Sequence, residues 1–172
     1  MTIASNTSPI IALARVGRLD LLASLFDVVL LPPAVKGECI DRGKEMGADD
    51  VYEIEKGLDA GWITVVPLEE DAEREAGRLQ ARAAVGRGEA EAIALARMRG
   101  VAVILDDADA RAAARSLGLE HMGTVMVPYH AFVRGLVSHR ELVSIVADLS
   151  RVLWVAPDVI AEMLRRAEGG NA

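Results

Sequence analysis

Short apolar runs alternate with longer helical patterns along this chain, and this alternation limits the fold more than any other feature. The runs at residues 28–31 and 101–105 are entirely apolar, as expected of strands that are covered on both faces. Helical patterns separate these runs, and several of them end at a glycine such as Gly17 or Gly100. We therefore predict an α/β fold in which helices cover a mostly parallel sheet, as a three-layer α/β/α sandwich with a helical C-terminal extension.

The predicted strands are short β-rich runs bounded by turn residues, and they cover residues 2–5, 28–31, 62–66, 101–105 and 119–122. The predicted helices have apolar residues three and four positions apart, and they cover residues 6–17, 20–26, 34–44, 47–61, 69–83, 89–99, 110–117, 125–134, 139–149 and 158–168. A turn is expected at residues 86–88. Because no repeat or low-complexity linker interrupts the pattern, we expect one domain over residues 1–172, with the extension from about residue 137.

Composition narrows the function. The 172 residues are 52% apolar and carry a net charge of −7, which argues against a broad surface for binding polyanions but leaves room for a local one. Arginine supplies nearly all of the positive charge, so any phosphate contact is expected to be an arginine contact. A lone cysteine, Cys39, fits a reducing compartment. We find no signal peptide or membrane span and expect a cytoplasmic protein.

Polar residues gather where two predicted strands end. Ligands of open parallel sheets bind beyond the carboxyl ends of the strands, so these residues are candidates for a site. They follow the strands directly or lie on adjoining helices: Asn6, Thr7, Ser8, Glu38, Glu89, Glu91, Asp106, Asp107 and Asp109. Two carboxylates 4 Å apart repel by about 4 kcal/mol at an effective dielectric constant near 20, and a divalent cation removes that cost. Oxygen ligands favour Mg²⁺ or Mn²⁺.

Each of these residues also has a structural explanation. Asn6, Ser8 and Asp107 are suited to cap helices, Glu89 and Glu91 are suited to the positive end of a helix dipole, and Glu38 fits a solvated helix face. Capping accounts for only one carboxylate of the pair Asp106 and Asp107. From the residues alone, the metal site and the structural explanation both stay open.

Several segments resemble the PIN-domain superfamily, and within it a prokaryotic group of predicted nucleic-acid-binding proteins related to the VapC ribonuclease toxins. The resemblance extends over nearly the whole chain, and its segments are residues 5–13, 17–22, 33–35, 88–96, 105–107, 123–124, 135–136 and 153–164. It implies an α/β/α fold and a Mg²⁺- or Mn²⁺-dependent ribonuclease, toxin-like and acting on single-stranded RNA. It also implies pairing as a homodimer and, for toxin-like members, an antitoxin peptide as partner.

Carried over by position, the resemblance implies catalytic carboxylates at Glu38, Glu91 and Asp107. The implied metal ligands are these three together with Asn6, Glu89 and Asp106, where Glu89 is the alternative to Glu91. Related sequences have aspartate where this chain has Asn6. An amide oxygen coordinates a hard cation but adds no negative charge and is no base, so the change is expected to weaken metal binding.

Three functions follow as hypotheses. The first is the metal-dependent ribonuclease, in which Thr7, Ser8, Arg87 and Arg111 contact the substrate. The second is an impaired PIN protein that binds nucleic acid or a protein partner without cutting, as Asn6 suggests. The third is a small-molecule-binding α/β domain. Further candidate phosphate contacts share a place near the expected acidic edge: Arg115, Arg134 and Arg140. For all five arginines, pairing with the surplus Asp and Glu residues on helix faces is an explanation that stays open.

Overall fold

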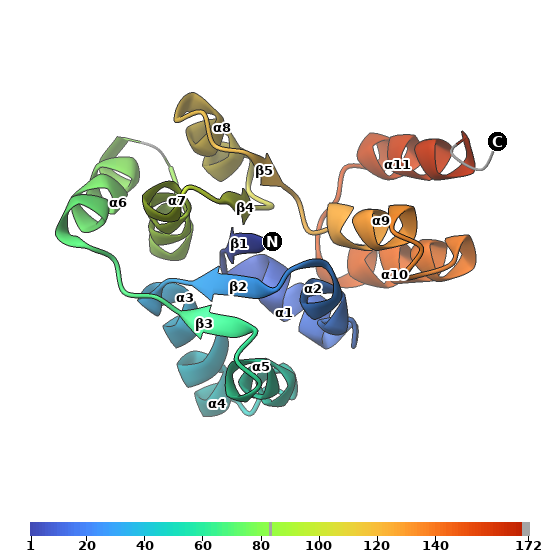
Figure 1. Ribbon diagram of the computed structural model, residues 1–172, viewed down its shortest axis with the longest axis horizontal. Helices are drawn as coiled ribbons and strands as arrows, with labels where there is room; N and C mark the ends of the chain where they lie inside the picture. Colours follow the sequence, from blue (N-terminus) through green and yellow to red (C-terminus); the bar gives the residue numbers. More distant parts are fainter. Residues whose placement is uncertain (83, 170–172) are drawn as a thin grey trace.

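The computed structural model describes residues 1–82 and 84–169 and contains a five-stranded, all-parallel sheet (Figure 1). Its strands are β1 (Thr2–Ser5), β2 (Val28–Leu31), β3 (Ile63–Val65), β4 (Ala102–Ile104) and β5 (His121–Met122). The order across the sheet is β3-β2-β1-β4-β5, and Ile3 of β1 lies opposite Val29 of β2 and Ala102 of β4. The chain adds β2 and β3 on one side of β1 and then crosses to the other side, where it adds β4 and β5. The boundary between β1 and β4 is therefore the topological switch point of the sheet.

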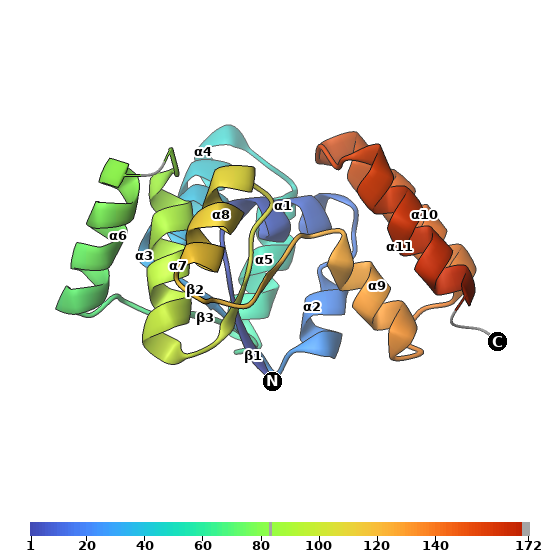
Figure 2. The ribbon, with the colours of Figure 1, turned by 90° about the horizontal axis from the view of Figure 1, so that it is seen from above.

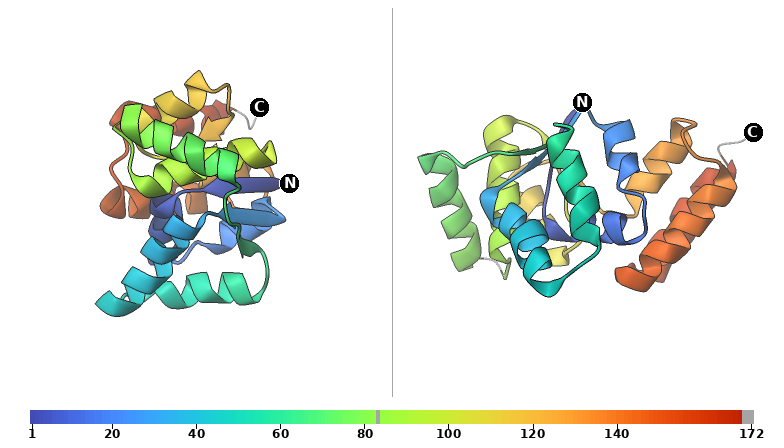
Figure 3. Two further views of the ribbon diagram at one scale, coloured as in Figure 1. Left: turned by 90° about the vertical axis from the view of Figure 1, so that its left-hand side faces the viewer. Right: turned by 90° about the horizontal axis from the view of Figure 1, so that it is seen from below.

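Helices cover both faces of the sheet, which gives three layers (Figure 3). The helical elements of the first layer are α1 (Thr7–Arg15), α2 (Asp20–Leu25), α3 (Pro33–Lys36), the π-helical turn η1 (Gly37–Asp41), α4 (Arg42–Met46) and α5 (Asp50–Asp59). Those of the opposite layer are α6 (Glu70–Arg82), α7 (Arg87–Arg99) and α8 (Ala108–Ser116). Alternate strand residues point to the two layers: Ile3 and Val29 pack in the first core, and Ala4 and Leu30 in the second.

The C-terminal part is helical and packs beside the first layer (Figure 2). It comprises α9 (Met126–Val133), α10 (His139–Val152) and α11 (Pro157–Gly169). Ile145 and Leu149 of α10 belong to the main core, while Leu142 packs with Met163 of α11 in a smaller cluster. The extension is therefore attached through a shared core.

The predicted α/β/α architecture is confirmed, while several element ends differ. The helix expected at 34–44 is continuous through α4 but contains the π-helical turn η1. The turn expected at 86–88 is wrong in part, because Arg87 and Gly88 already lie in the first turn of α7 and only Gly86 stands before it. The strand expected at 119–122 has only two paired residues, since β5 contacts just the end of β4. The expected last residue of the 69–83 helix lies outside the described residues.

No helix among the described residues combines the length and the apolarity needed to cross a bilayer.

Candidate active site

The candidate site lies at the carboxyl edge of the sheet, at the switch point between β1 and β4. Asn6 directly follows β1, and Asp106 and Asp107 follow Leu105 at the end of β4. The two segments are held together because the backbone N–H of Asn6 donates to the carbonyl of Ile104 at 3.4 Å. Helix starts and strand ends converge here, which is the usual position of a ligand in this class of sheet.

Asn6 is buried but its side-chain oxygen has no partner. The residue is 2% exposed, and among the described residues nothing donates a hydrogen bond to Oδ1. Asn6 occupies the N-cap position of α1, yet its side chain makes no capping bond. A buried acceptor without a donor is costly, so helix capping does not explain this asparagine. An amide oxygen in this condition is a suitable ligand for a hard cation.

Glu38 is held at the start of α1 by a contact with Thr7, the residue that follows Asn6. It lies on the π-helical turn η1, and the hydroxyl of Thr7, in the first turn of α1, donates to Glu38 Oε2. Gly88 of α7 approaches the same carboxylate so closely that a Cβ at that position would lie 3.0 Å from Oε2. A glycine at position 88 therefore leaves room for the Glu38 carboxylate, which lies directly against α7.

Glu89 faces the other carboxylates of the site. Its side chain accepts a hydrogen bond from the backbone N–H of Gly86 at 2.6 Å. Burial raises the pKa of Glu89, and the negative charges of Asp107, Glu38 and Asp109 raise it further, against the lowering effect of the Gly86 hydrogen bond. Mutual repulsion of this kind indicates that these four carboxylates share one electrostatic environment.

Glu91 has a different set of contacts. It is 8% exposed and accepts hydrogen bonds from the backbone N–H of Ala34 at 3.0 Å and from Arg87 Nε at 2.8 Å. The carboxylate thus bonds a free N–H group in the first turn of α3, and Glu38 lies about one turn further along the chain, on η1. It also pairs with an arginine of its own helix. In this conformation Glu91 positions α3 relative to α7.

Asp106 and Asp107 also differ in their contacts. Asp106 accepts hydrogen bonds from the backbone N–H and the hydroxyl of Thr124, at 2.8 and 2.6 Å, and so holds the segment before α9 against the end of β4. Burial raises the pKa of Asp106, while the Thr124 hydrogen bonds lower it. Asp107 is exposed and caps α8 through its Oδ1, which accepts from Ala110 N at 2.8 Å. Its Oδ2 stays available at the site.

The four expected substrate contacts lie at this edge, with different partners. Thr7 is bonded to Glu38, and Ser8 is exposed in the first turn of α1. The guanidinium of Arg87 is 74% exposed beside Glu91, and Arg111 donates to the carbonyl of Asp106.

Arg134 is placed elsewhere, so the expectation that it lies near the acidic edge is wrong. It donates to the carbonyl of Leu25 and lines a hollow with Met1 at the amino end of β1. Helix α9 runs away from the acidic edge and carries Arg134 with it.

The donor set fits a hard divalent cation better than zinc, since it offers carboxylate oxygens and an unpartnered amide oxygen. Within residues 1–82 and 84–169, no three His, Cys, Asp or Glu side chains are close enough to bind one ion together. Mg²⁺ usually keeps several waters and contacts only one or two carboxylates of the protein, so the arrangement is compatible with such a site.

Sequence reasoning missed the role of Gly88, because the consequence of a missing Cβ depends on which side chain lies opposite. It gave Asp109 only a secondary place beside Asp107. The order strand, Asp107, helix was the available signal, since Asp109 lies in the first turn of the helix that Asp107 caps.

Comparisons with known proteins agree with this fold. A family model, DUF3368, described as a PIN domain, matches residues 2–169. The solved structure of VapC20 from Mycobacterium tuberculosis, a toxin that cleaves the Sarcin-Ricin loop, is 24% identical and has a TM-score of 0.52. The match covers 64% of this chain and 94% of that one. VapBC2 from Rickettsia felis, bound to a DNA fragment from their promoter, is 12% identical with a TM-score of 0.50. Here 72% of this chain and 98% of that one are covered. The search of curated proteins found no match.

Proposed function

Because the chain belongs to the DUF3368 family of PIN domains, we propose that it is a metal-dependent ribonuclease of the toxin type. The observation that carries the proposal is the buried, unpartnered oxygen of Asn6 at the switch point of the sheet, next to Thr7, whose hydroxyl bonds to Glu38. Glu89 feels the negative charges of Asp107 and Glu38, which raise its pKa. Acidic residues that repel one another without a cation are the expected state of a site that binds one.

The residues have distinct roles in this proposal. Asn6 and one or two of the carboxylates Glu38, Glu89 and Asp107 would hold Mg²⁺ or Mn²⁺, and the others would contact its waters, with Glu91 as the alternative to Glu89. When bound, the cation supplies an activated water and stabilises negative charge on the phosphate.

Two further residues act by position. Thr7 orients Glu38 through its hydroxyl, and Asp106 fixes the loop after β4 through Thr124. Neither needs to contact the cation, since each already holds a neighbouring part of the site in place.

The decisive experiment measures cleavage of single-stranded RNA in Mg²⁺ or Mn²⁺ by wild type, Asp107→Ala and Asp107→Asn. Asparagine caps a helix as well as aspartate does, so Asp107→Asn removes the charge without removing the α8 cap. We expect both variants to lose cleavage, and the control Asp148→Asn, on the exposed side of α10, to keep it. Full activity in Asp107→Asn would refute the assignment of this residue.

The second candidate function is an impaired PIN protein that binds RNA or a protein without cutting, and Asn6 is the observation that favours it. The site then lacks one negative charge, and the cation is bound more weakly. This candidate predicts RNA binding without cleavage in the wild type.

The partner and the compartment belong to the proposal as well. We propose a cytoplasmic homodimer that binds an antitoxin. Light scattering of the purified chain tests the dimer. A small reading frame for a DNA-binding protein beside the gene would support the antitoxin, and its product should co-purify with the chain.

A further inference from the structure

Two hollows adjoin the acidic cluster, and each shares one carboxylate with it. The first, of about 380 Å³, lies between α3 and α7 and is lined by Glu38, Arg42 and Arg87. The second, of about 680 Å³, lies between α6 and α8 and is lined by Arg78, Arg82 and Asp109. Glu38 and Asp109 belong to different elements that meet at the carboxyl edge. Each hollow therefore combines one carboxylate of the cluster with two arginines.

Most of these arginines are not neutralised by the protein. Within the described part of the chain, Arg42, Arg78 and Arg82 form no ion pair, and all three are exposed. Arg87 pairs with the buried Glu91 through its Nε alone, while the Arg87 side chain is 74% exposed. A guanidinium has five N–H donors, so Arg87 can bind a phosphate through its Nη groups while it stays bonded to Glu91.

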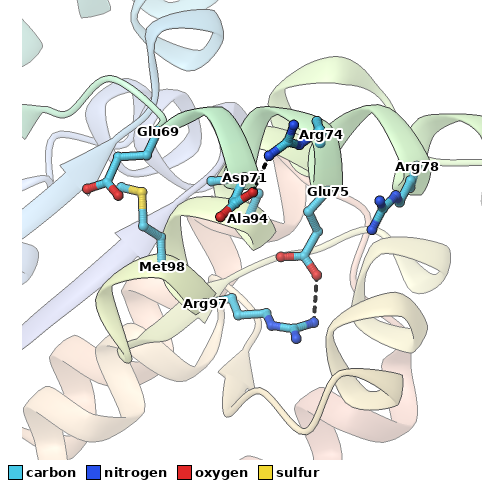
Figure 4. Close-up of a pocket in the computed structure, with 9 residues that line it drawn as sticks. Glu69, Asp71, Arg74, Glu75, Arg78, Ala94, Arg97 and Met98 are labelled. Carbon is cyan, nitrogen blue, oxygen red and sulfur yellow. Dashed lines mark hydrogen bonds and ion pairs between the residues drawn. The ribbon is translucent and has the colours of Figure 1, made fainter.

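A neighbouring hollow is neutralised in large part by the protein itself. It lies between α6 and α7 and has a volume of about 390 Å³, and two of its arginines are paired, Arg74 with Asp71 and Arg97 with Glu75 (Figure 4). Its third arginine, Arg78, also lines the α6–α8 groove. Arg42, Arg78 and Arg82 thus offer unpaired positive charge in hollows that each contain a carboxylate of the acidic cluster, in a protein whose net charge of −7 gives no general attraction for nucleic acid.

We propose that a single strand of RNA lies across the site from the α3–α7 hollow to the α6–α8 groove. Arg42 and Arg87 bind backbone phosphates on one side of the acidic cluster, and Arg78 and Arg82 bind them on the other. The floor of the α6–α8 groove is partly apolar, with Leu79, Ala113 and Leu117, and suits contact with bases. This inference rests on the proposed function and specifies how that site holds its substrate.

The test measures binding of a fluorescent single-stranded RNA to the full chain in Mg²⁺ by anisotropy, at several salt concentrations. The background variant is Glu38→Gln, so that the RNA stays intact. To it we add Arg78→Gln with Arg82→Gln, or Arg42→Gln with Arg87→Gln, or the control Arg99→Gln. Arg99 is exposed in the last turn of α7, at the far end from the site.

We expect each double substitution to weaken binding by about 10-fold or more at low salt. It should also reduce the slope of log K against log salt by about 1.4, because each lost phosphate contact on a single strand contributes about 0.7. The control should match the background variant in both quantities. Thermal unfolding should be unchanged by Arg78→Gln with Arg82→Gln and by Arg99→Gln, since these side chains are exposed. Arg87→Gln takes a hydrogen bond from the buried Glu91, so the Arg42→Gln and Arg87→Gln variant is compared with the background variant at a temperature at which both are folded.

Two failures are distinguishable. If the wild type neither binds nor cleaves RNA, the proposed function is wrong and the inference falls with it. If the wild type cleaves RNA and Asp107→Asn does not, but the arginine pairs behave like Arg99→Gln, only the proposed path is overturned. An effect from one pair alone also overturns it, because the path requires contacts on both sides of the cluster.

Discussion

At the scale of single residues, the site contains one buried acceptor without a donor and a glutamate that is repelled by neighbouring carboxylates. Asn6 Oδ1 has no partner among the described residues, and Glu89 lies among three other negative charges. Neither feature benefits a protein that needs only to fold, because both reduce its stability. Their presence at one edge is the strongest reason to assign a ligand there.

Restoring the carboxylate that related sequences have at position 6 should strengthen metal binding. We expect Asn6→Asp to bind Mn²⁺ at least about 10-fold more tightly, since about 1.4 kcal/mol of added attraction gives that factor. Titration calorimetry measures it. A gain in RNA cleavage would show that the wild-type site is impaired, and an unchanged Mn²⁺ affinity would mean that side chain 6 does not face the ion.

The raised pKa of Glu89 predicts a pH-dependent stability of the metal-free protein. The folded state holds this proton more tightly than the unfolded chain, whose value is near the ordinary 4.5. The free energy of unfolding is therefore larger below pH 4.5 and falls as pH rises through the pKa of folded Glu89.

Glu89→Gln should remove this dependence. At pH 7 without metal it should melt above wild type by about 1–3 °C, a small shift for a chain of this size, and the difference should vanish below pH 4.5. Thermal unfolding followed by circular dichroism measures it, with exposed Glu120→Gln as control. Saturating Mn²⁺ should reverse the order. A variant less stable than wild type at pH 7 would contradict the repulsion inferred here.

At the scale of elements, a break in regular helix and a missing side chain shape the site. The π-helical turn η1 carries Glu38, and such turns are frequent at functional sites. Gly88, in the first turn of α7, leaves space for the Glu38 carboxylate. The sequence predicted both helices, but a π-helical turn has no sequence signature, and the neighbour of Gly88 is 50 positions away in the chain.

A methyl group at position 88 should therefore impair function more than folding. In Gly88→Ala the new Cβ meets the Glu38 carboxylate at 3.0 Å, so the carboxylate must shift from Thr7. We expect Mn²⁺ affinity and RNA cleavage to fall by a few-fold, because the shift is a few tenths of an ångström and a 1 Å misplacement of an active group costs about 100-fold.

The matched control is Gly77→Ala in the middle of α6, where no atom lies within 4 Å of the added Cβ. It should raise stability by up to about 1 kcal/mol and leave activity unchanged. If Gly88→Ala behaves in the same way, Gly88 does not shape the site.

At the scale of the whole molecule, the helical extension and the sheet share a core. Leu149 of α10 is fully buried in the same cluster as Ile3 and Ile104. A shared core couples the stability of both parts, so we expect the chain to unfold as one cooperative unit, as the sequence prediction of a single domain requires.

Leu149→Ala tests that coupling. It should cost about 2–5 kcal/mol and lower the whole transition, whereas Leu136→Ala, at an exposed position, should change stability by less than about 0.5 kcal/mol. Scanning calorimetry should give equal calorimetric and van't Hoff enthalpies for both. A second transition, or a Leu149→Ala effect confined to part of the heat absorption, would mean that the extension is a separate domain.

The sequence alone determined the α/β class, the layers and the placing of the acidic residues at strand ends, because periodicity and turn residues are local properties. Only the tertiary structure distinguished the surroundings of neighbouring candidates. Glu89 faces Asp107 and Glu38, while Glu91 binds Ala34 and Arg87, although both glutamates lie in the first two turns of one helix. The environment of a carboxylate depends on burial and on partners brought from distant segments, and neither can be obtained from the spacing of residues along the chain.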